Sequence, residues 1–214
     1  MNARERILGR IRAAQTRAQP GMPTGAIADH LAQHPRGPQP PAPGDLVARF
    51  RERALKLSSD VLETNERTAI PALLARYLNE RKLPGRGVCW PALGDLPWSV
   101  AGLDMQPRPA RDDDPVGVTG AFCAIAETGT LMLLSGAGTP ATTSLLPETH
   151  VAIVDPRRIV ATMEDAWDLL RKERRQPPRA VNFISGPSRT ADIEQTVTLG
   201  AHGPYRVLLI LAPL

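Results

Sequence analysis

The feature that most constrains the fold is a change of pattern near residue 85. Beyond this point, short apolar runs bounded by glycine and proline replace helical periodicity, which is typical of buried strands. Helical spacing returns at residues 159–171, between two of these runs. We expect strands at residues 87–90, 102–105, 124–126, 130–134, 150–155, 180–184 and 206–211. Strands that alternate with helices predict an α/β fold with a mainly parallel sheet flanked by helices.

Two helices are expected ahead of the strands, so that the α/β domain spans residues 45–214. Asp45 can cap a helix whose apolar positions run from Val47 to Val61 in steps of three and four residues. A second helix is expected at residues 65–81, where Pro71 is tolerable only in the first turn.

The first 44 residues divide into an expected helical appendage and an expected linker. Ile7, Leu8 and Ile11 fall at helical spacing among arginines, so residues 1–18 are interpreted as a short amphipathic helix. Three alternatives stay open for this helix: packing on its own or a sister subunit, docking on another protein, or a mitochondrial transit-like peptide. Residues 19–44 hold seven prolines and four glycines, and we expect them to form a linker without a helix.

Composition excludes several classes of protein. Lys and Arg number 26 against 22 Asp and Glu, but the excess lies in the first 18 residues, so the body of the chain is not a basic nucleic-acid binder. No apolar run approaches the roughly 20 residues of a bilayer span. Only Cys89 and Cys123 are present, whereas a cluster held by thiolates needs about four cysteines. No apolar core follows the N-terminal charges, and we expect a cytoplasmic protein.

Two loops in the middle of the chain carry side chains suited to chemistry. Residues 126–130 place Glu127, Thr128 and Gly129 directly after a buried strand, although a plain hairpin turn is the alternative. Residues 135–140, with the hydroxyls that follow as far as Ser144, can bring backbone amides close to an anion, or they form a flexible connection. Because open α/β sheets bind ligands beyond the carboxyl ends of their strands, we expect the functional loops at that edge.

A third loop and a later turn complete the expected site. Residues 184–194 run from a strand into Gly-Pro, then Ser-Arg-Thr, then two carboxylates. Short hydroxylated residues at such a junction expose N–H groups that can hold a phosphate or a carboxylate, although Ser188 or Thr190 can also simply cap a helix. His202 lies in a tight turn before the last strand and carries an imidazole, a side chain able to accept a proton, with a purely structural role as the alternative.

Five motifs together point to a known family. They read Gly-Val-Thr-Gly-Ala at 117–121, Ala-Ile-Ala-Glu-Thr-Gly-Thr at 124–130, Ser-Leu-Leu-Pro-Glu-Thr-His at 144–150, Gly-Pro-Ser-Arg-Thr-Ala-Asp-Ile-Glu at 186–194 and Gly-Ala-His-Gly-Pro at 200–204. With these motifs the chain resembles the LutC/YkgG lactate utilisation proteins, which are built on the LUD domain. The resemblance covers about residues 45–212 and implies a fold similar to the NagB/RpiA/CoA-transferase class.

The resemblance also implies a role in bacterial growth on L-lactate, in which three proteins encoded together oxidise lactate to pyruvate. Since two cysteines cannot ligate a cluster, we expect no cofactor in this chain and iron–sulfur clusters in its partner proteins. We expect a site for a small anionic metabolite, with Glu127 and His202 as candidates for proton transfer. The candidate ligand-binding residues are Thr128, Gly129, Ser144, Glu148, Gly186, Pro187, Ser188, Thr190, Asp192 and Glu194. No metal site, nucleic-acid partner or membrane span is expected, and oligomerisation stays open.

Two other functions also remain open. The chain can be a non-catalytic assembly or regulatory component with a vestigial pocket, tethered to a partner by its first 44 residues. By analogy with the fold class, it can also be an independent transferase or isomerase that acts on a phosphorylated or CoA-linked substrate.

Overall fold

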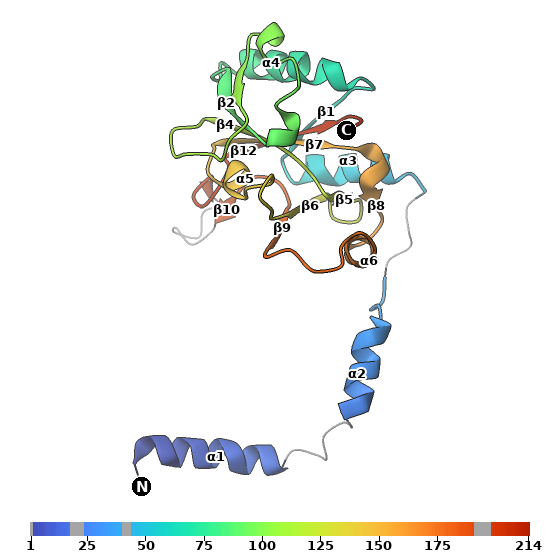
Figure 1. Ribbon diagram of the computed structural model, residues 1–214, viewed down its shortest axis with the longest axis vertical. Helices are drawn as coiled ribbons and strands as arrows, with labels where there is room; N and C mark the ends of the chain where they lie inside the picture. Colours follow the sequence, from blue (N-terminus) through green and yellow to red (C-terminus); the bar gives the residue numbers. More distant parts are fainter. Residues whose placement is uncertain (1, 18–23, 40–43, 191–197) are drawn as a thin grey trace. The chain divides into compact units, whose positions relative to one another are not determined.

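A computed structural model describes residues 2–17, 24–39, 44–190 and 198–214. The chain divides into two compact units, Met1–Pro41 and Ala42–Leu214, and each is described by itself. In the larger unit two sheets pack together, with helix α4 (Ile70–Glu80) over the outer face of the main sheet and helix α6 (Met163–Glu173) over the outer face of the smaller one, as Figure 1 shows.

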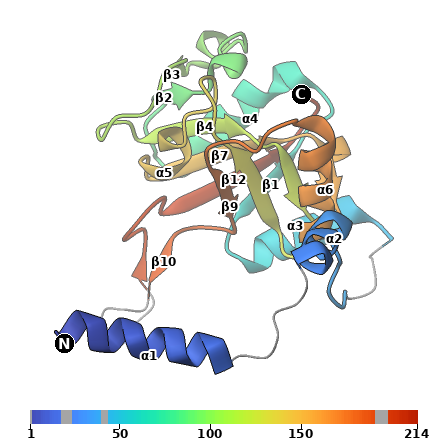
Figure 2. The same ribbon diagram turned by 60° about the horizontal axis from the view of Figure 1, so that its bottom comes forward.

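The main sheet has six strands that all run parallel. In spatial order they are β1 (Asp60–Glu63), β12 (Arg206–Leu211), β7 (Thr149–Val154), β4 (Val116–Gly120), β2 (Arg86–Cys89) and β3 (Asp104–Gln106), an arrangement that can be followed in Figure 2. The central strands β7 and β4 are buried along their whole length, which is the signature of a parallel sheet covered on both faces. The predicted α/β fold with a mainly parallel sheet is confirmed.

A smaller sheet packs beside the main one. Its strands, in spatial order, are β8 (Ile159–Val160), β5 (Cys123–Ile125), β6 (Thr130–Leu134) and β9 (Val181–Ile184), and a separate antiparallel pair joins β10 (Arg189–Thr190) to β11 (Thr198–Leu199). Alternate residues of β5 enter two different cores. Ala124 belongs to the core shared with the main sheet, whereas Cys123 and Ile125 pack with helix α6 (Met163–Glu173). The two-residue period of a strand thus buries β5 on both faces.

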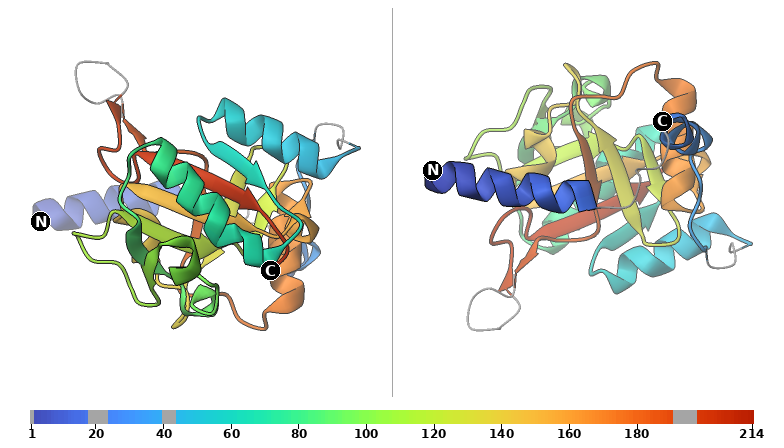
Figure 3. Two further views of the ribbon diagram at one scale, coloured as in Figure 1. Left: turned by 90° about the horizontal axis from the view of Figure 1, so that it is seen from above. Right: turned by 90° about the horizontal axis from the view of Figure 1, so that it is seen from below.

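The helices begin and end at identifiable signals. The N-cap residue Asp45 accepts a hydrogen bond of 3.0 Å from the Ala48 amide and starts α3, as predicted. Thr162 and Asp165 form a reciprocal capping box at the start of α6. Figure 3 shows α4 lying across the main sheet. The helices of this unit are α3 (Leu46–Lys56), α4 (Ile70–Glu80), α5 (Thr142–Leu145) and α6, with short 3-10 turns at Arg67–Ala69, Pro91–Leu93, Ser99–Ala101 and Pro156–Arg158.

Some predicted boundaries are wrong for local reasons. The helix expected to reach Val61 ends at Lys56, because Ser58 adopts a left-handed φ of 64° and the chain then turns into β1. The helix expected at residues 159–171 begins only at Met163, because residues 159–160 pair with β5 as strand β8. Strand β4 was not among the expected strands, since its two glycines weaken the apolar pattern.

Within its described residues, 2–17 and 24–39, the smaller unit contains the helices α1 (Ala3–Arg17) and α2 (Thr24–Gln33). The expectation that residues 19–44 hold no helix is therefore wrong. The segment contains no proline between Pro23 and Pro35, so no helical hydrogen bond is lost to a proline there and α2 can form. The apolar side chains Ile7, Ile11 and Leu31 are all exposed. No described helix combines the length and the apolar character that a bilayer crossing requires.

Candidate functional site

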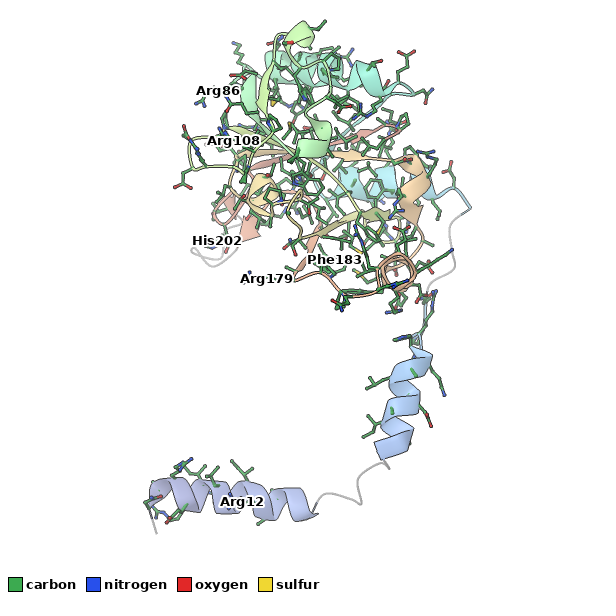
Figure 4. All side chains as sticks on the ribbon, viewed as in Figure 1. Arg12, Arg86, Arg108, Arg179, Phe183 and His202 are labelled. Carbon is green, nitrogen blue, oxygen red and sulfur yellow. The ribbon has the colours of Figure 1, made fainter. Side chains whose placement is uncertain are left out.

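The predicted residues Glu148 and His202 lie on one cavity at the amino ends of β7 and β12. The cavity has a volume of about 590 Å³ and is lined by Leu145, Leu146, Glu148, Gly200, Ala201, His202, Gly203, Tyr205 and Arg206. Figure 4 labels His202 on the side of the domain where Figure 1 places β10. Its imidazole is exposed to solvent, and no hydrogen bond or ion pair of this side chain occurs within the described residues.

Arg206 supplies a positive charge to this cavity. Its Nη1 atom is buried and has no hydrogen-bond partner in the described part of the chain, while Glu148 Oε2 lies 3.7 Å away as a loose ion pair. The Glu148 side chain is 79% exposed, so it can move aside without breaking a packed contact. The guanidinium also lies over the Tyr205 ring, 4.8 Å from its centroid, which fixes its position. An incoming carboxylate can therefore compete with Glu148 for Arg206.

The loop that carries Ser188 is attached to the turn that carries His202. The Ser188 amide donates to Pro204 C=O, and the Gly200 amide donates to Ser188 C=O, each with an N···O distance of 2.9 Å. A side chain at Gly203 would contact the Ser188 side chain at 3.4 Å. The two predicted segments are thus brought together, but the Ser188 amide is already used within the protein.

Gly186 and Pro187 are placed against the protein rather than at an opening. Gly186 has a φ of 79°, and a Cβ there would lie 2.3 Å from the backbone oxygen of Leu57, so glycine is required by both conformation and space. Pro187 and Thr190 are buried. Asp192 and Glu194 lie outside the described residues.

The turn between β5 and β6 forms a second group, linked to the same loop. The hydroxyls of Thr128, Thr130 and Ser185 form a chain with two O···O distances of 2.7 Å. Gly129 has a φ of 71° and packs on α3, where a Cβ would lie 2.7 Å from the Ala54 nitrogen. Glu127 is half-buried at this turn, its amide donates to Ala161 C=O, and it does not line the cavity beside His202.

Ser144 lies inside α5, and its hydroxyl donates to Ala141 C=O at 2.9 Å. The helix sits directly on β4, because Gly117 has no side chain: a Cβ there would lie 2.0 Å from the backbone oxygen of Thr143. The Ser144 side chain is buried, so α5 contributes to the support of the cavity mainly through Leu145, which lines it.

The expectation that the functional loops share the carboxyl edge of one sheet is wrong. Glu148 and His202 precede their strands and therefore lie at the amino ends of β7 and β12, whereas Glu127 follows β5 of the smaller sheet. The sequence pattern did not separate two sheets, since the buried strands of both read as short apolar runs.

Sequence reasoning missed a buried polar pair behind α5. The His150 Nε2 atom lies 2.8 Å from Thr119 Oγ1, both side chains are fully buried, and His150 Nδ1 has no hydrogen-bond partner in the described part of the chain. Burial lowers the pKa of His150 to about 4, so its imidazole is neutral at pH 7. The one sign of this buried pair in the sequence is the position of His150 near the polar start of an otherwise apolar strand. Within the described ranges, no cluster of three or more His, Cys, Asp or Glu could hold a metal ion.

Known proteins of similar sequence and of similar structure point to one family. A model of the LUD domain family matches residues 112–212. The lactate utilization protein C of Bacillus subtilis (strain 168) is 35% identical over 187 residues, which cover 78% of each chain. The protein of the same name from Exiguobacterium sp. is 32% identical over 178 residues, 78% of this chain and 77% of the relative. The crystal structure of a DUF162 family protein from Deinococcus radiodurans matches 81% of this chain and 99% of its own, with 25% identity and a TM-score of 0.60.

Proposed function

Because this chain belongs to the lactate utilization protein C family, we propose that it takes part in lactate utilisation, as a cytoplasmic subunit of a system that oxidises L-lactate to pyruvate. The observation that carries the proposal is the 35% identity to a lactate utilization protein C over 78% of both chains. In this proposal the chain binds a small anionic metabolite, and iron–sulfur partner proteins accept the electrons.

The cysteines support the assignment of the electron carriers to the partners. Cys89 and Cys123 are both buried and free, and they belong to different sheets. Burial raises the pKa of Cys89 to about 11 and that of Cys123 to about 12, so neither is a thiolate at neutral pH. Cluster ligation requires about four thiolates, which this pair does not offer.

The cavity beside His202 is the proposed place for the anion. Arg206 offers a guanidinium with one buried nitrogen that lacks a hydrogen-bond partner among the described residues, a group suited to a carboxylate. His202 lines the same cavity and is the proposed acceptor of the lactate hydroxyl proton, while the Cα hydrogen leaves with the electron pair as hydride to a redox cofactor of the partner proteins, which passes the electrons to their clusters. Glu127 lies outside this cavity lining, so it is assigned no contact with this anion.

Growth on L-lactate as sole carbon source tests the proposal. Deletion of the gene is expected to abolish growth on L-lactate but not on glucose, and the wild-type chain is expected to restore it. His202→Ala and Arg206→Gln are expected to restore growth poorly, while Arg175→Ala, which changes an exposed arginine outside this cavity, restores it fully. Growth of the deletion strain on L-lactate would refute the role. Full rescue by His202→Ala would refute the catalytic assignment and leave the subunit role.

A non-catalytic assembly role is a second candidate, favoured by the exposed apolar side chains of the smaller unit. Ile7 is 58% and Leu31 65% exposed, on two helices that follow one another in the chain. Such side chains can dock a partner protein. Removal of residues 1–44 is then expected to abolish co-purification with the iron–sulfur proteins. Unchanged co-purification would exclude this tether.

A further inference from the structure

A second cavity lies at the opposite end of the main sheet, where the carboxyl ends of β2 and β4 meet the end of β6. Its volume is about 370 Å³. It is lined by Trp90, Ala121, Phe122, Leu134, Ser135, Gly136, Thr139, Arg174, Gln176 and Pro178. None of these residues lines the cavity beside His202. The carboxyl ends of parallel strands are where open α/β sheets usually bind ligands, and the volume lies in the range of small-molecule sites.

The inner wall of this cavity is apolar and largely aromatic. Trp90 follows β2, Phe122 follows β4, and Leu134 ends β6, so three separate strands fix the wall. Trp90 is held by a hydrogen bond from its Nε1 atom to Pro140 C=O, at 3.3 Å. The Phe122 ring lies against the guanidinium of Arg158, 4.7 Å from its centroid, which fixes this ring as well. A rigid wall of this kind suits a flat aromatic ring better than a three-carbon acid such as lactate.

Two hydroxyls on the glycine-rich turn give this wall a polar edge. Ser135 Oγ accepts from the Ala180 amide at 2.8 Å, which leaves its own hydrogen to donate. Thr139 Oγ1 donates to Leu134 C=O at 2.7 Å, which leaves its oxygen to accept. The turn thus presents one donor and one acceptor, the combination that the nitrogen-bearing edge of a heteroaromatic ring requires.

Positive charge gathers beside the cavity. Arg174 lines it, and the guanidinium of Arg174 forms no hydrogen bond or ion pair within the described ranges. The neighbouring carboxylate of Glu173 is already held by Arg158, with N···O distances of 2.6 and 3.0 Å. Lys172, Arg175 and Arg179 are exposed on the same segment, where Figure 4 labels Arg179. A guanidinium that makes no hydrogen bond or ion pair among the described residues is a suitable group for a phosphate.

We propose that this cavity binds a mononucleotide-class ligand, with its heteroaromatic ring against Trp90 and Phe122 and its phosphate at Arg174. The proposal does not depend on the role in lactate utilisation, because it concerns a different cavity at the opposite end of the sheet.

Calorimetric titration of the full chain tests the proposal, with AMP and nicotinamide mononucleotide as probes. Adenosine supplies a ring without the phosphate, and ribose 5-phosphate supplies the phosphate without the ring. At least one nucleotide is expected to bind, with adenosine about tenfold weaker and ribose 5-phosphate weaker still. If neither nucleotide binds at millimolar concentration, or if ribose 5-phosphate binds as tightly as AMP, the proposal is wrong.

Matched variants locate the binding. Arg174→Ala is expected to weaken nucleotide binding about tenfold and to leave adenosine binding unchanged, since it removes only the phosphate contact. Arg175→Ala changes an adjacent exposed arginine that does not line the cavity, and it is expected to have no effect. Phe122→Ala is expected to weaken both ligands, with circular dichroism to confirm folding. Equal effects of Arg174→Ala and Arg175→Ala, or unchanged binding in folded Phe122→Ala, would overturn the assignment.

Discussion

The buried histidine of β7 gives a prediction about stability at acidic pH. His150 is fully buried, only Thr119 hydrogen-bonds its imidazole among the described residues, and burial lowers its pKa from 6.5 to about 4. In the unfolded chain the imidazole takes up a proton near pH 6.5, whereas in the folded chain it does so only near pH 4. Between these two values the unfolded state binds more protons than the folded state. The contribution of His150 to the free energy of unfolding is therefore complete above pH 6.5 and is lost as the pH falls towards 4.

The size of this effect follows from the two pKa values. Between pH 7 and pH 4.5 the wild-type chain is expected to lose about 2 kcal/mol of unfolding free energy through His150 alone. His150→Gln keeps a hydrogen-bonding side chain near Thr119 but does not titrate, so it is expected to lose about 2 kcal/mol less over the same range. Urea denaturation of both chains at the two pH values measures this difference. The carboxylates titrate alike in both chains, so their contribution drops out of the comparison. Equal pH dependence in the two chains would refute the reasoning.

Three further predictions concern single positions in the fold. Gly186→Ala is expected to lower the free energy of unfolding by more than about 1 kcal/mol, because φ is 79° there and a Cβ would lie 2.3 Å from a backbone oxygen. Gly138 has open space around it, so Gly138→Ala is expected to be nearly neutral in the same urea titration. Thr162→Ala removes a capping box and is expected to cost about 1 kcal/mol; an unchanged denaturation midpoint would contradict this. Asp114→Asn is expected to lower the melting temperature, because the buried carboxylate accepts two hydrogen bonds from Arg108, at 2.7 and 2.8 Å. A melting temperature equal to that of the wild type would contradict this prediction.

Much of the fold could be predicted because its strands are short apolar runs with clear ends. The expected strands at residues 130–134 and 206–211 match β6 and β12 at both ends, and Asp45 caps α3 as expected. Prediction failed where a pattern fits two structures. Residues 159–160 continue the helical spacing of α6, but pairing with β5 makes them a strand. Local sequence does not contain that tertiary contact.

The sequence indicated several residues of the candidate site but not where in the fold they lie. The turn with His202 and the loop with Ser188 do come together, through two backbone hydrogen bonds that no motif indicates. The rule that ligands bind at carboxyl ends of strands misplaced this group, since both Glu148 and His202 precede their strands. From the sequence, Arg206 is predicted only as part of a strand, because the folded chain alone shows that its buried Nη1 atom has no hydrogen-bond partner among the described residues.

Reduction of an artificial electron acceptor by L-lactate, measured in cell extracts, tests the central claim most directly. Extracts of a strain that lacks this gene are expected to show no L-lactate-dependent reduction, and addition of the purified wild-type chain is expected to restore it. Equal rates in extracts with and without the chain would contradict a role for it in lactate oxidation.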